Sequence, residues 1–327
     1  MQDALESPSF SRKNSWAFQL ALCLLGPFFF LSVFFSIFAP LPALYLRQGF
    51  ETEKLSRIWS LIAVFVGCAL CGLIKGGVGA LGFFLFASLP ALMLGELLGK
   101  KKSPELAISA AALLVLFATC ALGFGIAKSH EAPLIPFVRT ELKSAIHEMS
   151  TRLIETQKGD LATESLEELK KIAENPNLLI DELPGILLSA ILLLCTIPCV
   201  AMIRWNPKGF LRRSGIPRDF LRKWRSPEWL VWIALFCLAF LIFEVPYLSP
   251  IANNLLKPIL LIYFFQGMSI LAFFLDSLRI RGPIRLILYG FGIVFLTPMV
   301  ISFGFFDLWF DFRRRRQDGI DEKDEEV

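Results

Sequence analysis

Long charge-free runs alternate with short polar segments along most of the chain. No Asp, Glu, Lys or Arg occurs in seven runs, which are 17–46, 58–74, 76–95, 106–127, 183–203, 258–275 and 286–306. About 20 apolar residues suffice to cross a bilayer as a helix, so these runs predict membrane spans. The pattern predicts an all-α, polytopic transmembrane helical bundle. It excludes a soluble enzyme, a disordered chain and a nucleic-acid-binding domain.

The same pattern divides the chain into five parts. These are a polar tail (1–14), N-terminal transmembrane helices (15–128), an acidic extramembrane helical segment (129–183), C-terminal transmembrane helices (184–312) and a charged tail (313–327). The expected number of spans is about eight. It is nine if the proline-containing run 15–48 forms two helices rather than one long kinked helix.

The composition supports a membrane protein. Of the 327 residues, 55% are hydrophobic and 19% are charged, against about 45–50% and about 25% in ordinary soluble domains. All seven cysteines lie in apolar runs, which is not the pattern of a disulfide framework. Cys68 and Cys71 have no His or acidic group nearby to complete a metal site. We therefore expect no metal and no cofactor.

The extramembrane segment is predicted to be a helical hairpin. Its first helix has one apolar face, made of Ile135, Val138, Leu142, Ile146, Met149 and Leu153. A second helix is expected from the capping box at Ser165 and ends before Asn175. This hairpin would lie on the bundle or dock a partner.

The loop 204–228 is strongly basic and includes Arg212, Arg213 and Arg222. Ile216, Phe220 and Trp224 recur at four-residue spacing. A short basic amphipathic helix here would suit anionic lipid headgroups. Equally, the loop could serve only to set topology. We do not expect it to bind nucleic acid.

Positive charge places four loops on the cytoplasmic side of the membrane. These loops contain Arg47, Lys100, Arg213 and Arg279, and the acidic segment would then lie outside. The cluster that begins at Arg313 does not fit this alternation if 285–306 crosses once. Either that last segment is re-entrant and broken at 297–298, or one of the loops is misplaced.

Polar groups within the apolar runs are candidate ligand contacts, because they are costly in a bilayer. Asn254, Tyr263 and Gln266 lie on one predicted helix and could orient a small molecule. Hydrogen bonds to other helices are the commoner role for such residues. Glu96 and Lys75, near span ends, are expected to reach the interface. The sequence shows no nucleophile, paired acid or metal set, so we expect no enzyme.

The end of the last span combines aromatic and charged residues. Asp307, Trp309, Asp311 and Arg313 would form an interfacial anchor. Asp311 could also pair with Arg315 at the i,i+4 spacing. The functional alternative is a surface that couples to a partner.

Three stretches resemble a known family. Asn254-Leu255-Leu256 with Tyr263-Phe264-Phe265-Gln266-Gly267, Gly304-Phe305-Phe306-Asp307-Leu308-Trp309-Phe310-Asp311-Phe312-Arg313, and Pro40-Leu41-Pro42 before Arg47-Gln48-Gly49 look like the YybS-like family of bacterial membrane proteins. The resemblance covers about the first 130 and the last 130 residues. It implies a multi-pass protein of the bacterial cytoplasmic (inner) membrane.

That family distantly resembles the substrate-capture subunits of energy-coupling-factor vitamin transporters. The likeness implies a small-molecule ligand within the bundle and a separate ATPase-driven coupling module as partner. This chain has more spans, an acidic insert and no Walker A loop of its own. Two hypotheses follow: a substrate-binding or transport subunit, or a non-transport scaffold that docks a partner through 129–182 or the basic loop.

Overall fold

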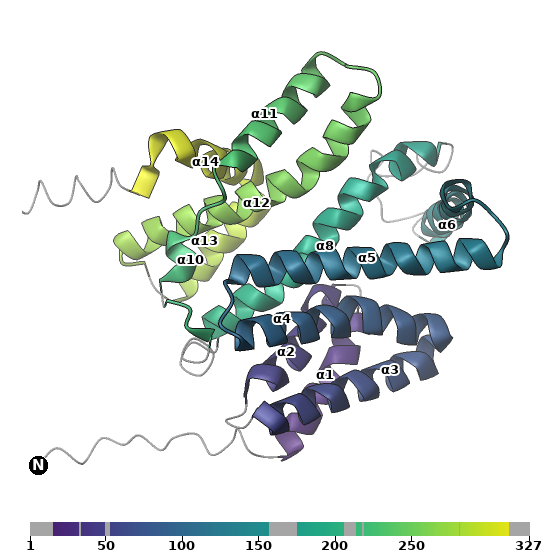
Figure 1. The fold of residues 1–327 in the computed structure, drawn as a ribbon. Helices are drawn as coiled ribbons and strands as arrows, with labels where there is room; N and C mark the ends of the chain where they lie inside the picture. The colour runs from purple at the N-terminus through teal and green to yellow at the C-terminus, as the bar shows by residue number, and fades with distance from the viewer. Residues whose placement is uncertain are drawn as a thin grey trace, which may run out of the picture. The chain divides into compact units, whose positions relative to one another are not determined.

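The computed structural model describes residues 16–32, 34–49, 53–156, 175–205, 214–217, 219–280 and 282–313. All regular elements in these ranges are helices (Figure 1), which confirms the all-α prediction. The chain divides into two compact units. The N-terminal unit comprises Met1–Gly125 and Ala190–Arg218, and the C-terminal unit comprises Ile126–Ser189 and Asp219–Val327.

Within the described part of the chain, four helical stretches are long and apolar enough to cross a membrane. They are Glu53–Gly99, Pro104–Ser129, Leu179–Arg204 and Leu248–Ser277. The pair Pro283–Val294 and Thr297–Phe310, bent by 91°, would make a fifth. Trp16–Leu31 and Trp229–Ile242 are apolar but shorter. The structure therefore supports several membrane spans, while the predicted count of eight or nine is not confirmed.

The first apolar run forms two α-helices rather than one kinked helix. Helix α1 (Trp16–Leu31) is followed by a 3-10 turn, η2 (Ser36–Phe38), and by α2 (Pro40–Gly49). Pro40 and Pro42 fall in the first turn of α2, where a missing backbone N–H costs nothing because it has no intrahelical acceptor. The prolines thus mark where the second helix begins.

The next helices fold back on themselves. Helix α3 (Glu53–Phe83) continues through a π-turn, η3 (Phe84–Ser88), into α4 (Leu89–Gly99). Gly76 interrupts α3 with a φ of 69° and a ψ of −166°. A β-carbon on Gly67 would lie 2.0 Å from the ring of Phe83, although 16 residues of straight helix would separate them by about 24 Å. The chain therefore makes a helical hairpin at Gly76, so that α3 and α4 run back along each other (Figure 1), in keeping with the two spans predicted from the runs 58–74 and 76–95.

Helix α5 (Pro104–Ser129) leads to α6 (Leu134–Thr156), and α8 (Asn177–Trp205) follows. Helix α6 covers the residues predicted for the first helix of the extramembrane segment. Its predicted apolar face is only partly buried, because Ile146 is buried while Ile135 and Met149 are 77% and 60% exposed. The predicted second arm lies outside the described residues.

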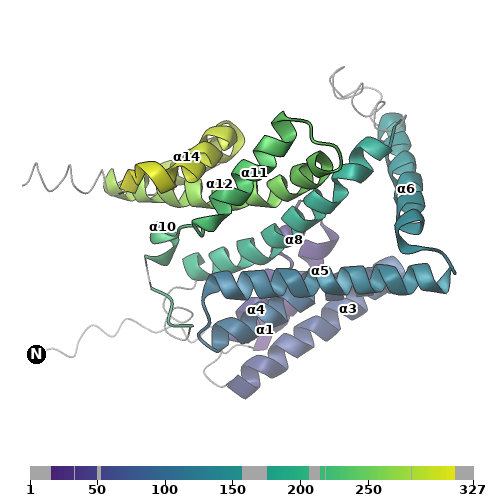
Figure 2. The ribbon, with the colours of Figure 1, turned by 45° about the horizontal axis from the view of Figure 1, so that its top comes forward.

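The C-terminal unit contains α10 (Phe220–Lys223), α11 (Trp229–Ile242), α12 (Leu248–Ser277), α13 (Pro283–Val294) and α14 (Thr297–Phe310). Helices α12 and α14 lie side by side in both ribbon views (Figures 1 and 2). A β-carbon on Gly267 would lie 1.9 Å from the carbonyl oxygen of Val300, and one on Gly304 would lie 2.0 Å from that of Tyr263. Only glycine allows two backbones to approach so closely.

The predicted amphipathic helix of the basic loop is shorter than expected. Helix α10 has only four residues, and Ile216 lies outside it. One turn cannot present an extended apolar face. The basic segment is instead held by its contacts with α12 and with the residues after α14, as described below.

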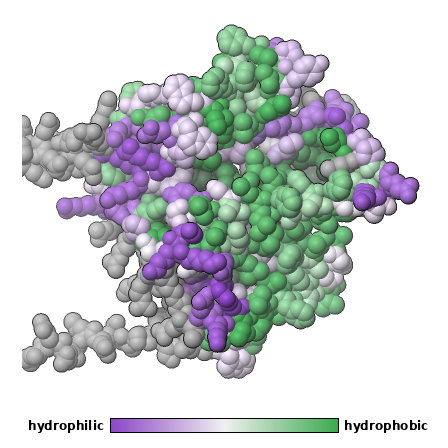
Figure 3. Space-filling model, viewed as in Figure 1, coloured by the Kyte–Doolittle hydropathy of each residue, from purple (hydrophilic) through white to green (hydrophobic). Residues whose placement is uncertain are grey.

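Large apolar side chains face outward on the candidate spans. Phe65, Leu73 and Val78 are 76–83% exposed. Hydrophobic residues cover much of the face shown in Figure 3. Soluble monomers rarely expose apolar patches of this extent. Hydrocarbon is the solvent that such a surface requires.

Candidate functional site

A buried carboxylate organises the end of the C-terminal unit. The side chain of Asp307, near the end of α14, is 0% exposed. Arg313 Nη2 donates to Asp307 Oδ2 at 2.9 Å, and Gln266 Nε2 donates to the same oxygen at 3.2 Å. The backbone N–H of Phe312 donates to Oδ1 at 3.2 Å. These three donors compensate a charge that would otherwise be very costly to bury.

The same residues hold the basic segment that precedes α11. Arg313 Nη1 donates to the carbonyl of Arg222 at 2.8 Å, and Nη2 donates to that of Trp224 at 3.1 Å. Gln266 Oε1 accepts from the backbone N–H of Ser226 at 3.1 Å and from its hydroxyl. We call Gln266, Asp307 and Arg313, with the residues they bind, the Asp307 network. Burial lowers the pKa of the Arg313 guanidinium, and the neighbouring Asp307 carboxylate opposes that fall.

The sequence-predicted interface residues are thus largely brought together. Asp311, in a left-handed conformation with a φ of 40°, ends α14 and pairs with Arg225. Trp309 is 52% exposed and packs against Phe305 at 5.4 Å between ring centroids. Arg212 and Arg213, and Arg315 as the predicted partner of Asp311, lie outside the described residues.

The start of α13 and the residues after α14 are both linked to Arg222. At the start of α13, Arg285 pairs with Asp276, whose other carboxylate oxygen lies 3.5 Å from Arg222. After α14, Arg313 binds the backbone of Arg222. The segment 283–313 therefore leaves the basic segment and returns to it.

The three predicted ligand residues do not gather at one place. Asn254 Oδ1 accepts from the backbone N–H of Gly185 at 2.7 Å, and its Nδ2 donates to the carbonyls of Asp181 and Pro250 at 2.8 and 2.9 Å. It thereby ties the start of α8 to α12. Gln266 is three turns further along α12, about 18 Å away, and belongs to the Asp307 network.

Tyr263 lies on α12 between Asn254 and Gln266. Its side chain is 1% exposed in a core with Leu230, Val231 and Ile259. Its hydroxyl has no hydrogen-bond partner among the described residues, which is unusual for a buried O–H. Ligand binding by Asn254, Tyr263 and Gln266 stays a prediction.

A second charged group, in the N-terminal unit, was not anticipated from the sequence. Arg47, near the end of α2, is 8% exposed, and its Nη2 lies 2.6 Å from Glu96 Oε2 on α4. Arg57 on α3 and Lys100 after α4 lie 3.6 and 3.1 Å from the other Glu96 oxygen. Glu53 lies 2.5 Å from Arg57. We call these five residues the Arg47 cluster.

Neighbouring side chains fix α2, and with it Arg47. Gln48 Nε2 donates to the carbonyl of Gly95 at 2.6 Å, and the Ser56 hydroxyl donates to that of Leu46 at 2.8 Å. A β-carbon on Gly95 would lie 2.4 Å from Cγ of Arg47. The glycine pair Gly95 and Gly99 was a visible signal of close packing, but nothing local identified Arg47 as the side chain that fills the space.

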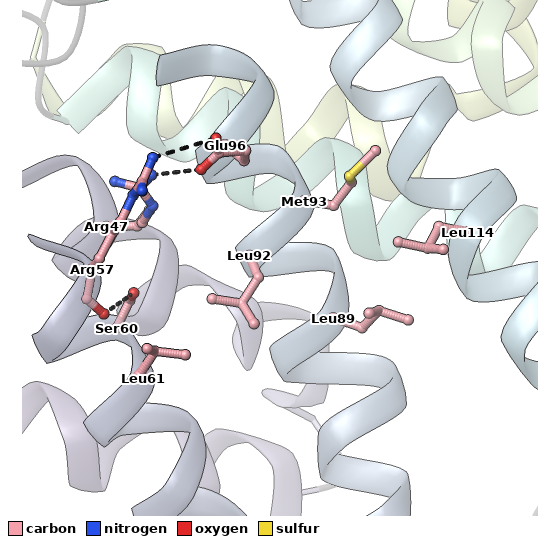
Figure 4. A pocket seen from close by; sticks show the side chains of 9 residues that line it. All are labelled: Arg47, Arg57, Ser60, Leu61, Leu89, Leu92, Met93, Glu96 and Leu114. Atoms are coloured by element: carbon pink, nitrogen blue, oxygen red, sulfur yellow. Dashed lines mark hydrogen bonds and ion pairs between the residues drawn. The ribbon is translucent and has the colours of Figure 1, made fainter. Parts of the chain in front are cut away.

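The Arg47 cluster opens onto a pocket of about 430 Å³. Arg47, Arg57 and Glu96 lie at one end of it (Figure 4). The rest of the wall is mostly apolar and comprises Leu61, Leu89, Leu92, Met93 and Leu114. The pocket therefore has a charged end and a hydrocarbon wall supplied by α3, α4 and α5.

The described residues show no arrangement suited to a metal. All seven cysteines are unpaired. No group of three His, Cys, Asp or Glu side chains in the described ranges is placed to hold an ion. The side chains that line the pocket offer charge pairing at one end and apolar contact along the wall.

Long apolar helices with outward-facing hydrophobic side chains define an α-helical integral membrane protein. Within that class, the chain belongs to the DUF2232 family of predicted membrane proteins, whose sequence model matches residues 17–308. No curated protein and no solved structure matches it.

Proposed function

We propose that this protein binds a small amphipathic molecule within the bilayer, as the substrate-binding subunit of a transport system and without catalytic chemistry of its own. The observation that supports this is the pocket beside the Arg47 cluster. An amphipathic molecule has one polar end and one apolar end, and so does this pocket. Its volume of about 430 Å³ falls within the range of about 300–1,000 Å³ that is usual for small-molecule sites.

The charged end is suited to exchange partners with a ligand. Arg57 is 53% exposed and Glu96 is 35% exposed, so a ligand group can reach both. Arg47 is nearly buried and held by Glu96, which keeps the end of the pocket in place before a ligand arrives. A preformed site loses less conformational entropy on binding.

The resemblance to substrate-capture subunits supports the transport part of the proposal. In such a system the energy would come from a separate ATPase-driven module. Asn254, Tyr263 and Gln266 lie on α12 and do not line this pocket, so ligand binding by them is a separate prediction. Among them, the Tyr263 hydroxyl, which has no partner among the described residues, is the group most in need of a polar contact.

Native mass spectrometry of gently purified protein tests the proposal. We expect a small amphipathic molecule, and under mild conditions an ATPase partner, to be retained. Leu92→Trp should fill the pocket and expel the molecule. Leu286→Trp is the matched control, because Leu286 is 73% exposed in the other unit. An empty wild-type protein, or equal retention by Leu92→Trp, would contradict the proposal.

The alternative is a scaffold that docks a partner through α6. Ile135 and Met149 are exposed on this helix, which lies outside the candidate spans. A photo-crosslinking residue at position 135 would capture such a partner. Capture of a partner by protein whose pocket is empty would favour the scaffold.

We also propose that the basic loops face the cytoplasm of a bacterial cell and that 283–313 is re-entrant. The support is that Arg285 and Arg313 both contact the neighbourhood of Arg222. This would return the C-terminal arginines to the positive side. Labelling a single cysteine introduced at position 320 tests it, since reaction from the outer face would exclude a re-entrant segment.

A further inference from the structure

We infer that the pocket beside the Arg47 cluster takes an anionic phospholipid, with its phosphate at Arg57 and Lys100 and an acyl chain along the leucines. The inference rests on the proposed function and names the class of ligand. Three observations support it: the charged residues lie at helix ends, their charges sum to an excess of positive charge, and the wall of the pocket is mostly apolar.

The charged end lies where three helix ends meet. Helix α2 ends at Gly49, α3 begins at Glu53 and α4 ends at Gly99. The Arg47 cluster sits at these ends, while the pocket continues along the apolar parts of α3 and α4. In a bilayer, helix ends with charged side chains lie at headgroup level and apolar stretches lie in the hydrocarbon. The charged end of the pocket would thus lie at the depth of a phospholipid headgroup, and its apolar wall at the depth of the acyl chains.

The cluster carries an excess of positive charge. Among the described residues, the acidic groups within 4 Å of Arg47, Arg57 and Lys100 are Glu53 and Glu96. The next two residues, Lys101 and Lys102, are also cationic and exposed. An anion offsets this excess of positive charge, whereas a zwitterionic headgroup brings a positive group that adds to it.

Arg57 can bind a phosphate without giving up its present partners. Its ion pairs with Glu53 and Glu96 both run through Nη2. A guanidinium has five N–H donors in one plane and suits bidentate contacts with phosphate oxygens. Lys100, 62% exposed and 3.1 Å from Glu96, adds a second cation on the exposed side.

The wall of the pocket matches an acyl chain. Leu61, Leu92 and Leu114 come from three different helices and present only hydrocarbon. Met93 adds an unbranched side chain that adapts to irregular shapes. A water-soluble anion would leave this wall without a partner, so the apolar part selects a lipid over a free phosphate.

Native mass spectrometry of the full chain from nanodiscs of equal phosphatidylglycerol and phosphatidylcholine tests the inference. Wild-type protein should retain phosphatidylglycerol in preference. The double variant Arg57→Gln/Lys100→Gln should weaken that preference by about fivefold for each charge removed, since each basic residue near an anionic surface contributes about 1 kcal/mol. The control variant Arg139→Gln/Lys143→Gln removes the same charge from α6 and should leave the preference for phosphatidylglycerol unchanged.

A gain-of-binding variant excludes misfolding as the explanation. Glu53, 69% exposed, contributes negative charge at the mouth, so Glu53→Gln should raise the preference by about fivefold. Inorganic phosphate should not displace the bound lipid. Displacement by phosphate would show that a free anion suffices, and it would overturn the lipid inference.

The outcomes separate this inference from the proposed function. Equal retention of both lipids by wild type, abolished by Leu92→Trp, would overturn the anionic preference and leave the amphipathic pocket standing. Retention that Leu92→Trp does not alter would overturn both. Preference for phosphatidylglycerol that survives Arg57→Gln/Lys100→Gln would overturn the assignment of these two cations.

Discussion

The Asp307 network and the Arg47 cluster are built from the same kinds of group but differ in access. Asp307 and Arg313 are 0% and 7% exposed, and their partners are other parts of the same unit. In the Arg47 cluster only Arg47 is buried, while Glu96 and Arg57 are 35% and 53% exposed beside a pocket. The first arrangement joins elements of the fold, and the second leaves a charged surface that a ligand can share.

This difference predicts opposite responses to substitution. Removing one member of a closed network leaves a buried charge without a partner. Removing Glu96 from the open cluster leaves Arg47 with a second carboxylate, that of Glu53 at 3.8 Å, and leaves cations that water or a ligand can reach, so the loss of stability is smaller and binding changes more.

The largest expected effect is at the helix crossing that carries Asp307. A β-carbon on Gly304 would lie 2.0 Å from the carbonyl oxygen of Tyr263, so the side chain of Gly304→Leu would clash with the backbone of α12. Helix α14 would have to move, and the Asp307 network would separate with it. We expect a loss of more than about 4 kcal/mol in the free energy of unfolding, measured as failure to yield folded protein in detergent. Gly290→Leu, with no atom within 4 Å of the added β-carbon, should fold; equal behaviour of the two would contradict the crossing.

Asp307→Ala should lower the free energy of unfolding by about 3–5 kcal/mol, because Arg313 would stay buried without its carboxylate. Denaturation followed by circular dichroism would measure this. Lipid retention at the pocket of the other unit should persist in whatever protein folds. A change below about 1 kcal/mol would mean that the network is open to water.

Glu96→Ala should have a smaller effect on stability and a visible effect on binding. Glu96 is one-third exposed, so we expect a loss of about 1–2 kcal/mol from the charged hydrogen bond to Arg47. Removal of its negative charge should strengthen retention of an anionic lipid by about fivefold. Weaker retention would instead assign Glu96 a direct part in holding the ligand.

The smallest expected effect is at an exposed pair. Arg139 Nη2 lies 2.6 Å from Asp181, but the two side chains are 48% and 61% exposed. Arg139→Gln should change the free energy of unfolding by less than about 0.5 kcal/mol. A loss comparable to that of Asp307→Ala would show that access does not distinguish the pairs.

The sequence pattern predicted most helices because a membrane span needs a continuous run of apolar residues, and such a run can be recognised locally. The charge of Lys75 separates two apolar runs at the place where the structure breaks α3 at Gly76. The prolines of 15–48 left one kinked helix or two open, and the structure has two. The second arm of the extramembrane hairpin lies outside the described residues and stays a prediction, as does the count of spans.

Partners were much harder to predict than positions. Arg47 and Glu96 are 49 residues apart, and no local pattern links them. Glu96 was expected at the interface on its position alone, and the residue that binds it became visible only when α2 and α4 were packed together. Similarly, Asn254 was recognised as a polar group in an apolar run, but its contacts with Gly185 and Asp181 are 69 and 73 residues distant.

The turn at Gly76 has a consequence for how this protein enters a membrane. Lys75, Gly76 and Gly77 are all that joins two apolar arms that contact each other, and no atom lies within 4 Å of a β-carbon built on either glycine. If both arms cross the bilayer, a connection this short favours their insertion as a pair, with the ammonium group of Lys75 at the tip.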